Sequence, residues 1–223
     1  EHAWFPIHRT AEEISEVKPE NRIIGFPYTK YMNSIMRVNQ SSALVMVSAK
    51  KAREMGIPES KWVFMHAGAC LNEIFHMSDR VDYHSSLAIK SCTDAVFDLS
   101  GTTQEEMAFL DIYSCFPSAV QIAINELGIK PNDSRGLTLT GGLPYFGGPG
   151  NAYVLNSMAS MVKKLRENPG KFALVTSNGW YLTKHGAGIF STKPLEGEWD
   201  QVVDTSKMQE EINNMDKPTF TET

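Results

Sequence analysis

Long apolar runs, clustered basic residues and cysteines are all scarce in this sequence. The longest unbroken apolar run covers residues 43–47, far short of the ~20 residues of a membrane helix, so we expect no membrane partner. Lys and Arg number 21 against 26 Asp and Glu, a net charge of −5, which argues against nucleic acid as a partner. The three cysteines, Cys70, Cys92 and Cys115, make no disulfide framework and predict reduced thiols in the cytoplasm.

The common motifs of serine hydrolases, nucleotide-binding proteins and zinc proteins are also missing. The chain has no G-x-S-x-G elbow, no G-x(4)-G-K-[ST] loop and no C-x-x-C pair. Its histidines lack the spacing of zinc ligands and stand at His2, His8, His66, His76, His84 and His185. We therefore expect no metal and no covalently bound cofactor.

The sequence does have the composition and the alternating pattern of a globular α/β protein. Apolar residues make up 42% and charged residues 21% of the 223 residues, enough for a real core. The pattern predicts strands at 43–48, 62–66, 109–113, 136–140, 172–177 and 180–184, and helices at 49–55, 87–99, 117–127 and 151–167. Strands that alternate with helices predict a mixed, mainly parallel five-stranded sheet with helices on its faces.

Composition divides the chain into an extended N-terminal segment (1–40), a strand and helix (41–60), a main α/β domain (61–193) and an acidic tail (194–223). The tail has eight acidic residues against Lys207 and Lys217, and we expect it to be a solvated extension or linker. The chain begins with Glu rather than Met, so we expect a fragment or a processed chain.

A glycine-rich segment joins the predicted strand at 136–140 to the predicted helix at 151–167. Five glycines and two prolines occur in residues 141–150, and Asn151 follows as a candidate helix N-cap. Glycine permits a close approach of the backbone, and free N–H groups at a helix start stabilise an anion or a polarised carbonyl. The alternative is a tight turn without a ligand.

Three segments, in order, resemble motifs of one family. Tyr113-Ser114-Cys115-Phe116 precedes a predicted helix, and Gly141-Gly142-x(4)-Gly147-Gly148-Pro149 follows later. Asn178-Gly179, in the stretch 176–179, predicts a hairpin turn between the last two strands. These resemble the N-E-A-F or H-D-C-F, GG-x(4)-GHP and C-x-G motifs of the thiolase superfamily. The resemblance covers roughly residues 25–192 and implies the C-terminal half of that fold, with 41–60 as the last strand and helix of the N-terminal half.

The family implies a fragment of a thiolase-type acyl-CoA acyltransferase, of the acetyl-CoA acetyltransferase family, with a coenzyme A thioester as substrate or ligand. It also implies that the full-length parent is a homo-oligomer, a dimer or tetramer. On this resemblance, Gly147, Gly148, Pro149, Asn178 and Gly179 shape the coenzyme A pocket.

The sequence departs from the family at its reactive positions. Gly148 stands where the family has a histidine base, Tyr113 where it has Asn or His, and Thr176 or Ser177 where it has a proton-shuttling cysteine. Glycine transfers no proton, and a hydroxyl forms no thiolate near neutral pH. The family's nucleophilic cysteine belongs to the N-terminal half. The resemblance therefore implies a degenerate acyltransferase.

Three other residues are candidates for chemistry at this site. Tyr113 could act as an acid or donate to a carbonyl, His185 could act as a base, and Cys115 precedes a helix N-terminus, which lowers thiol pKa values. Each has a plain alternative as a packed or buried side chain. Two further functions stay open: a non-catalytic acyl-CoA-binding or scaffold protein, and an aldolase-type lyase that uses Tyr113 on an acyl-CoA.

Overall fold

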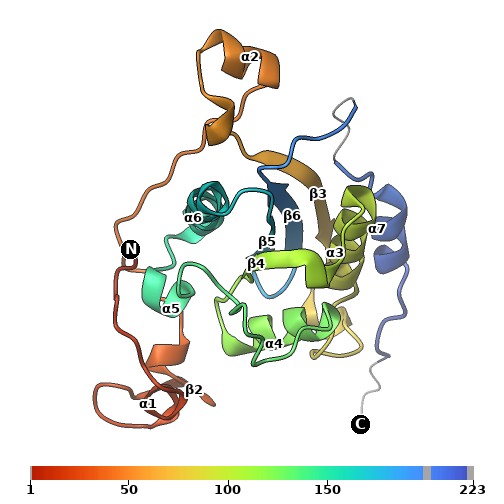
Figure 1. Cartoon of the computed structure of the whole chain (residues 1–223). Coiled ribbons are helices and arrows are strands. Elements are labelled where there is room, and N and C mark those ends of the chain that lie inside the picture. Colours follow the sequence, from red (N-terminus) through yellow and green to blue (C-terminus); the bar gives the residue numbers. More distant parts are fainter. Residues whose placement is uncertain (1, 198–201, 220–223) are drawn as a thin grey trace.

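A four-stranded sheet forms the centre of the fold. The computed structural model describes residues 2–197 and 202–219 (Figure 1). The strands lie in the order β3 (Phe64–Asn72), β6 (Lys184–Ser191), β5 (Phe172–Gly179) and β4 (Met107–Asp111). Only β4 and β5 run parallel among these pairs, and the other two pairs are antiparallel. A mixed α/β sheet is thus confirmed, but the prediction of five mainly parallel strands is wrong within the described residues.

The strand predicted at 136–140 is missing because a side chain replaces the backbone ladder. The Ile112 N–H donates to the Leu137 carbonyl at 2.8 Å. One step further on, the Leu139 N–H donates to the Asp111 carboxylate at 2.9 Å. The segment therefore runs beside β4 but forms no strand.

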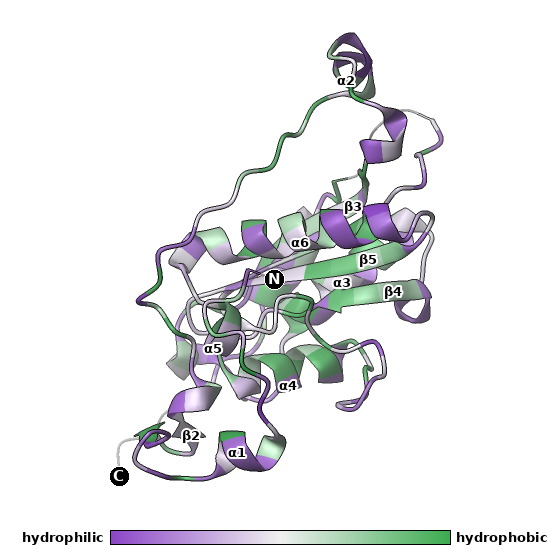
Figure 2. Ribbon diagram, turned by 60° about the vertical axis from the view of Figure 1, so that its left-hand side comes forward, coloured by the Kyte–Doolittle hydropathy of each residue, from purple (hydrophilic) through white to green (hydrophobic). Residues whose placement is uncertain are grey.

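The strand predicted at 43–48 is also absent. This segment forms no strand, and Val45 and Met46 are 79% and 75% exposed. It leads into α2 (Ala49–Glu54), close to the predicted helix, and α2 stands apart from the sheet in both views (Figures 1 and 2). A strand needs a partner for its N–H and C=O groups, and no part of the described chain lies there to supply one.

Helices cover both faces of the sheet. The larger core lies between the sheet and α3 (Leu87–Ser100) and α4 (Pro117–Glu126). A second core, which includes Met161 and Leu165, lies under α6 (Tyr153–Glu167) on the other face. Figure 2 shows β4 and β5 as an apolar layer between these helices.

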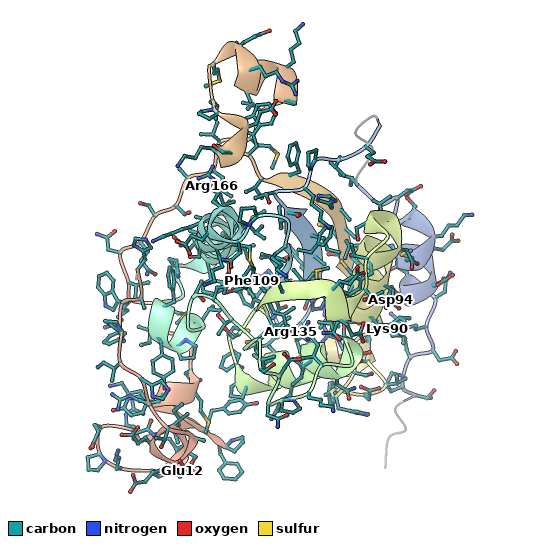
Figure 3. All side chains as sticks on the ribbon, in the orientation of Figure 1. Glu12, Lys90, Asp94, Phe109, Arg135 and Arg166 are labelled. Carbon is teal, nitrogen blue, oxygen red and sulfur yellow. The ribbon has the colours of Figure 1, made fainter. Side chains whose placement is uncertain are left out.

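Local signals explain why α3 forms where the sequence predicts it. The Ser86 hydroxyl caps the helix by accepting the Ile89 N–H at 3.2 Å. The helix ends at Gly101, whose φ of 62° lies in the left-handed region. Lys90 and Asp94 pair at 2.9 Å on its solvent side, one turn apart (Figure 3).

The hairpin between β5 and β6 turns later than predicted. Asn178 and Gly179 belong to β5, where they pair with residues of β6. The turn is made by residues 180–183, with Trp180 and Leu182 at φ values of 57° and 53°. The Asn-Gly signal was outweighed because the cross-strand pairing includes Asn178 and Gly179 themselves and ends only after them.

The smaller elements lie mostly before α3 and around the glycine-rich segment. They are α1 (Ala11–Ser15), β1 (Ile23–Gly25), β2 (Tyr28–Thr29) and α5 (Leu143–Phe146). Single 3-10 turns occur at Lys30–Met32, Glu59–Lys61, Met77–Asp79, Gln104–Glu106 and Gly150–Ala152. In Figure 1, α1 and β2 lie below α5, at the edge of the molecule.

The acidic tail is more ordered than a solvated linker. It contains α7 (Ser206–Asn213), which packs against α3 and β3 and buries Ile212 completely in the larger core. Gln209 on α7 also donates to the Asn72 carbonyl at 2.9 Å. The expectation of a free extension is therefore wrong for this part of the tail, while residues 198–201 and 220–223 lie outside the described residues. Among the described helices, none has the length and apolar character needed to span a bilayer.

Candidate functional site

A small hollow lies between the sheet, α3 and α4, near the ends of β4 and β5. About 340 Å³ of space lies between its atoms, counting the part open to solvent, and about 20 Å³ of it is wide enough to hold the centre of a water molecule. Its lining comes from both helices, the end of β4 and the β5–β6 hairpin: Ile89, Cys92, Thr93, Tyr113, Ala119, Ala123, Thr176, Ser177, Asn178, Leu182, His185 and Gly186. The fold thus brings Tyr113, Asn178 and His185, far apart in sequence, to one place.

Tyr113 follows β4 and is anchored at its backbone. Its N–H donates to the Thr176 hydroxyl at 2.9 Å, and its ring meets the Tyr153 ring edge-on with centroids 5.3 Å apart. Burial raises the pKa of the Tyr113 hydroxyl to about 12. At neutral pH the side chain is therefore a protonated phenol that can donate a hydrogen bond.

His185 lines the hollow and has one ring nitrogen without a hydrogen-bond partner among the described residues. It is only 6% exposed, and the unpaired atom is Nε2. Burial lowers the pKa of the imidazole below 6.5, and a hydrogen bond to the Leu182 backbone opposes this. The imidazole is therefore neutral at pH 7, with one ring nitrogen as a donor and the other as an acceptor.

Asn178 adds a second unpaired polar atom beside His185. The two residues are cross-strand partners, so their side chains emerge on the same face of the sheet. The Asn178 amide nitrogen donates to the Cys115 sulfur at 3.5 Å, whereas its Oδ1 atom is buried without a partner among the described residues. Two buried polar atoms without partners call for a ligand or a water that can hydrogen-bond to them.

Cys115 lies beside this cluster but is not activated. Burial raises the pKa of its thiol, and the hydrogen bond from Asn178 only partly offsets that effect. The influence of the α4 N-terminus, which was expected to lower this pKa, is therefore outweighed by burial. Cys115 is a thiol at neutral pH.

The glycine-rich loop faces the chain's own N-terminal segment. The Gly148 N–H donates to the Ile35 carbonyl at 2.8 Å. A Cβ atom on Gly147 would collide with the Gln40 side chain, and one on Gly148 with the Ser34 hydroxyl. Glycine suits the loop here because these side chains approach it closely and because Gly147 has a φ of 116°, which residues with side chains rarely adopt.

The glycine-rich loop and the hollow are therefore separate places. Gly147, Gly148 and Pro149 do not line the hollow, and neither does Gly179, which pairs with Lys184 in the hairpin. Nor does α6 begin at the predicted cap Asn151, because a 3-10 turn over Gly150–Ala152 comes first. The hollow and the loop are linked through Ser114, whose hydroxyl accepts the Leu143 N–H at 3.2 Å.

The fold resembles two solved structures. A monomeric SCP2-thiolase like protein type 1 from Mycobacterium smegmatis is 37% identical, with a TM-score of 0.90, over 99% of this chain and 48% of that one. The dimeric peroxisomal thiolase of Saccharomyces cerevisiae is 16% identical, with a TM-score of 0.61, over 86% of this chain and 45% of that one. This chain belongs to the thiolase superfamily.

The chain spans about half the length of both structures that it matches. No protein-family model and no curated protein sequence matches it. The resemblance of the sequence to the thiolase superfamily is confirmed. The likeness to the yeast enzyme is one of fold.

Two residues that anchor neighbouring segments were not found from the sequence. Asp111 is fully buried at the end of β4, and its signal was a lone carboxylate in the otherwise apolar run 109–113. Arg80 binds the β5–β6 turn, but it lies in a stretch, 67–85, whose pattern predicted no element.

Histidine, cysteine and carboxylate side chains do not gather into a metal site in this structure. Across residues 2–197 and 202–219, no group of three such side chains has the arrangement to hold an ion. The polar residues that line the hollow include a phenol, an amide and an imidazole as well as the hydroxyls of Thr93, Thr176 and Ser177, and such groups suit an organic ligand with its own hydrogen-bonding groups.

Proposed function

We propose that this chain is part of a thiolase-superfamily protein that binds an acyl-CoA thioester non-covalently at the hollow. The observation that carries the proposal is the pair of unpaired polar atoms, Asn178 Oδ1 and His185 Nε2, beside the protonated Tyr113. The Tyr113 hydroxyl would donate to the thioester oxygen. The two polar atoms would bind hydrogen-bonding groups of the ligand, such as the amides of the pantetheine arm.

Covalent acyl transfer through this chain's own thiols is the less favoured function. A thiolate is the form that attacks a thioester, and burial raises the pKa of Cys115 and raises that of Cys92 to about 12. We therefore propose that the acyltransferase chemistry of the family is degenerate here, with Gly148, Tyr113 and Ser177 or Thr176 at positions where the family has its reactive groups.

One observation favours a second candidate, a carbon–carbon lyase acting on a 3-hydroxyacyl-CoA. His185, whose imidazole pKa is lowered by burial and which is therefore a neutral base at pH 7, lines the same hollow as Tyr113. In such a step the unprotonated ring nitrogen takes the proton of the substrate hydroxyl, and the oxygen forms a carbonyl with its carbon. The Cα–Cβ bond breaks, its electron pair moves to Cα as a thioester enolate, and Tyr113 protonates Cα. The proton on His185 then returns to Tyr113, and no oxidant is needed.

Calorimetric titration of the chain with acetyl-CoA tests the binding proposal. We expect saturable binding that Tyr113→Phe weakens about tenfold, the value of one lost hydrogen bond. Tyr181→Phe is the matched control, because Tyr181 is 69% exposed and outside the lining of the hollow. Absence of binding, or equal affinities for Tyr113→Phe and the parent chain, refutes the proposal.

Mass spectrometry of the same mixtures separates the candidate functions. An acetyl adduct on Cys115 would support the acyltransferase function instead. Release of a carbonyl compound from a 3-hydroxyacyl-CoA, lost in both His185→Gln and Tyr113→Phe, would establish the lyase. Binding with neither outcome identifies a binding or scaffold protein.

We also propose that the full-length parent is a homo-oligomer. The two matching structures differ in this respect, since one is described as monomeric and the other as dimeric. Light scattering on the full-length protein decides the matter, and a monomeric mass rules out the oligomer.

A further inference from the structure

The hollow has room for one small group only. About 20 Å³ of it is wide enough to hold the centre of a water molecule, and ~10–15 Å³ of such space holds one water. A methyl group, such as that of an acetyl thioester, is only a little larger than water, whereas each further methylene of an acyl chain needs room of its own. A longer acyl group therefore enters only if part of the wall moves.

Leu182 is the lining residue best placed to move. Among the lining residues it alone belongs to the turn 180–183, and it is half-buried, whereas those that α3 and α4 contribute are all buried. Its neighbours Trp180 and Tyr181 are 73% and 69% exposed, so little packing holds the turn. Trp180 and Leu182 have φ values of 57° and 53°, and such conformations persist only where their surroundings fix them.

Arg80 binds the turn on both sides of Leu182. Its two terminal nitrogens donate to the Tyr181 carbonyl at 2.8 Å and the Thr183 hydroxyl at 3.2 Å. Its Nε donates to the Ile74 carbonyl at 2.8 Å, which ties the turn to the loop between β3 and α3. The planar guanidinium makes these three directed hydrogen bonds at once, which a lysine cannot reproduce. Arg80 therefore fixes the backbone of Leu182 through both of its neighbours.

Glu73 fastens the same turn to α3. Its N–H donates to the Thr183 carbonyl at 2.8 Å. Its buried carboxylate accepts the Ser86 hydroxyl at 2.8 Å and the Ala88 N–H at 3.2 Å, at the start of α3. The turn that carries Leu182 is thus tied to a helix that forms part of the wall of the hollow.

We propose that Leu182 sets the size of the group that the hollow admits, and that Arg80 is the residue that positions it. While the turn is held, the hollow accepts an acetyl group and excludes longer acyl chains. The ligand is then a short-chain acyl-CoA. This choice of ligand rests on the proposed function, whereas the size limit at Leu182 is measurable without any coenzyme A ester.

Calorimetric titrations with acetyl-CoA and hexanoyl-CoA test the size limit. We expect the parent chain to bind acetyl-CoA about tenfold more tightly or better, because extra methylenes in a filled site are unfavourable. Leu182→Ala and Arg80→Gln should each raise the ratio of hexanoyl to acetyl affinity about tenfold. Leu155→Ala is the control, because Leu155 lies on α6, is 41% exposed and does not line the hollow. Equal affinities of the parent chain for both esters, or an unchanged ratio in Leu182→Ala, overturn the proposal.

Xenon tests the role of Leu182 without a coenzyme A ester. Xenon enters small apolar cavities, and the methyl resonances of Ile89 and Ala123, which line the hollow, report its entry by NMR. We expect these resonances to shift with xenon pressure in Leu182→Ala and to stay unchanged in the parent chain. Entry into both chains, or into neither, contradicts a size limit at Leu182.

Amide exchange in the ligand-free chain tests the role of Arg80. The Thr183 N–H donates to the Gly179 carbonyl at 3.1 Å, and its exchange should be about tenfold faster in Arg80→Gln because the turn opens more often. Arg80→Lys lacks the planar fork and should give the same change if Arg80→Gln does not fold. Arg53→Gln, on α2, is the control and should exchange like the parent chain.

These results also separate the size limit from the proposed function. Equal exchange of the Thr183 amide in the parent chain and in a folded Arg80 variant overturns the role of Arg80. Xenon entry and faster exchange as expected, without binding of either ester, would remove the proposed function and leave the size limit at Leu182 intact.

Discussion

The Asp111 carboxylate at the end of β4 holds the segment 138–140 and Ser157 by hydrogen bonds, so its removal tests how much these bonds stabilise the fold. The side chain is fully buried. It accepts hydrogen bonds from the hydroxyls of Thr138 (3.1 Å) and Ser157 and from the N–H groups of Leu139 (2.9 Å) and Thr140 (3.3 Å). We predict that Asp111→Ala lowers the free energy of unfolding by ~3 kcal/mol and Asp111→Asn by ~1 kcal/mol or less.

The difference follows from what each variant leaves unpaired. In Asp111→Ala the Leu139 N–H loses its partner, at a cost of ~1–3 kcal/mol, and the emptied volume adds ~1 kcal/mol. The Thr140 N–H keeps a second bond to the Thr138 hydroxyl at 3.1 Å. Asparagine has the same shape, so its oxygen keeps the backbone donors while its amide donates to the Ser157 hydroxyl.

The contribution of Asp111 to the free energy of unfolding should depend on pH in one direction. Burial raises the pKa of Asp111 above 3.8, and the four hydrogen bonds only oppose that effect. A raised carboxyl pKa means that this group's contribution to stability is complete below pH 3.8 and is lost as the pH rises through the folded-state pKa. Asparagine resembles the protonated acid. The free energy of unfolding of Asp111→Asn, relative to that of the parent chain, should therefore be more favourable at pH 7 than at pH 4.

Urea unfolding followed by circular dichroism at both pH values measures these differences. A loss of 3 kcal/mol should also lower Tm by ~6–12 °C for a chain of this size. Asp98→Ala, at an exposed position on α3, is the control and should change stability by less than ~0.5 kcal/mol. The prediction is refuted if the free energy of unfolding of Asp111→Ala lies within ~1 kcal/mol of that of the parent chain, or if Asp111→Asn loses as much stability as Asp111→Ala.

Three more outcomes follow from the packing. Ile212→Ala should lower the free energy of unfolding in urea by ~2–4 kcal/mol, because the Ile212 side chain of α7 is fully buried; a loss below ~1 kcal/mol would mean that α7 does not pack against the core. Gly148→Ala should destabilise the chain and increase protease cleavage near Ser34, whose hydroxyl the new methyl group meets; unchanged cleavage would contradict that contact. Iodoacetamide at pH 8 should label the exposed Cys70 well before the half-buried Cys115, as peptide mass spectrometry can follow, and equal rates would contradict the raised pKa of Cys115.

The site was only partly readable from the sequence. Tyr113 and Asn178 stood out because each lies in a motif at the predicted end of a strand, and His185 because it follows the predicted turn. The sequence did not show that the glycine-rich loop would face residues 34–40 instead of these side chains. That contact joins segments more than 100 residues apart, and no local pattern encodes it.

The helices at 87–100, 117–126 and 153–167 were determined by the sequence itself, within two residues at each end. A helix makes its hydrogen bonds within its own segment, and its caps and apolar spacing are local. The segments 43–48 and 136–140 have strand-like patterns. No strand of the described chain lies beside residues 43–48 to pair with them, and residues 136–140 run beside β4 but bond to the Asp111 side chain in place of the backbone. Tertiary structure therefore decided which apolar runs joined the sheet, and it alone brought Tyr113, Asn178 and His185 to one hollow, since that meeting depends on contacts between distant parts of the chain.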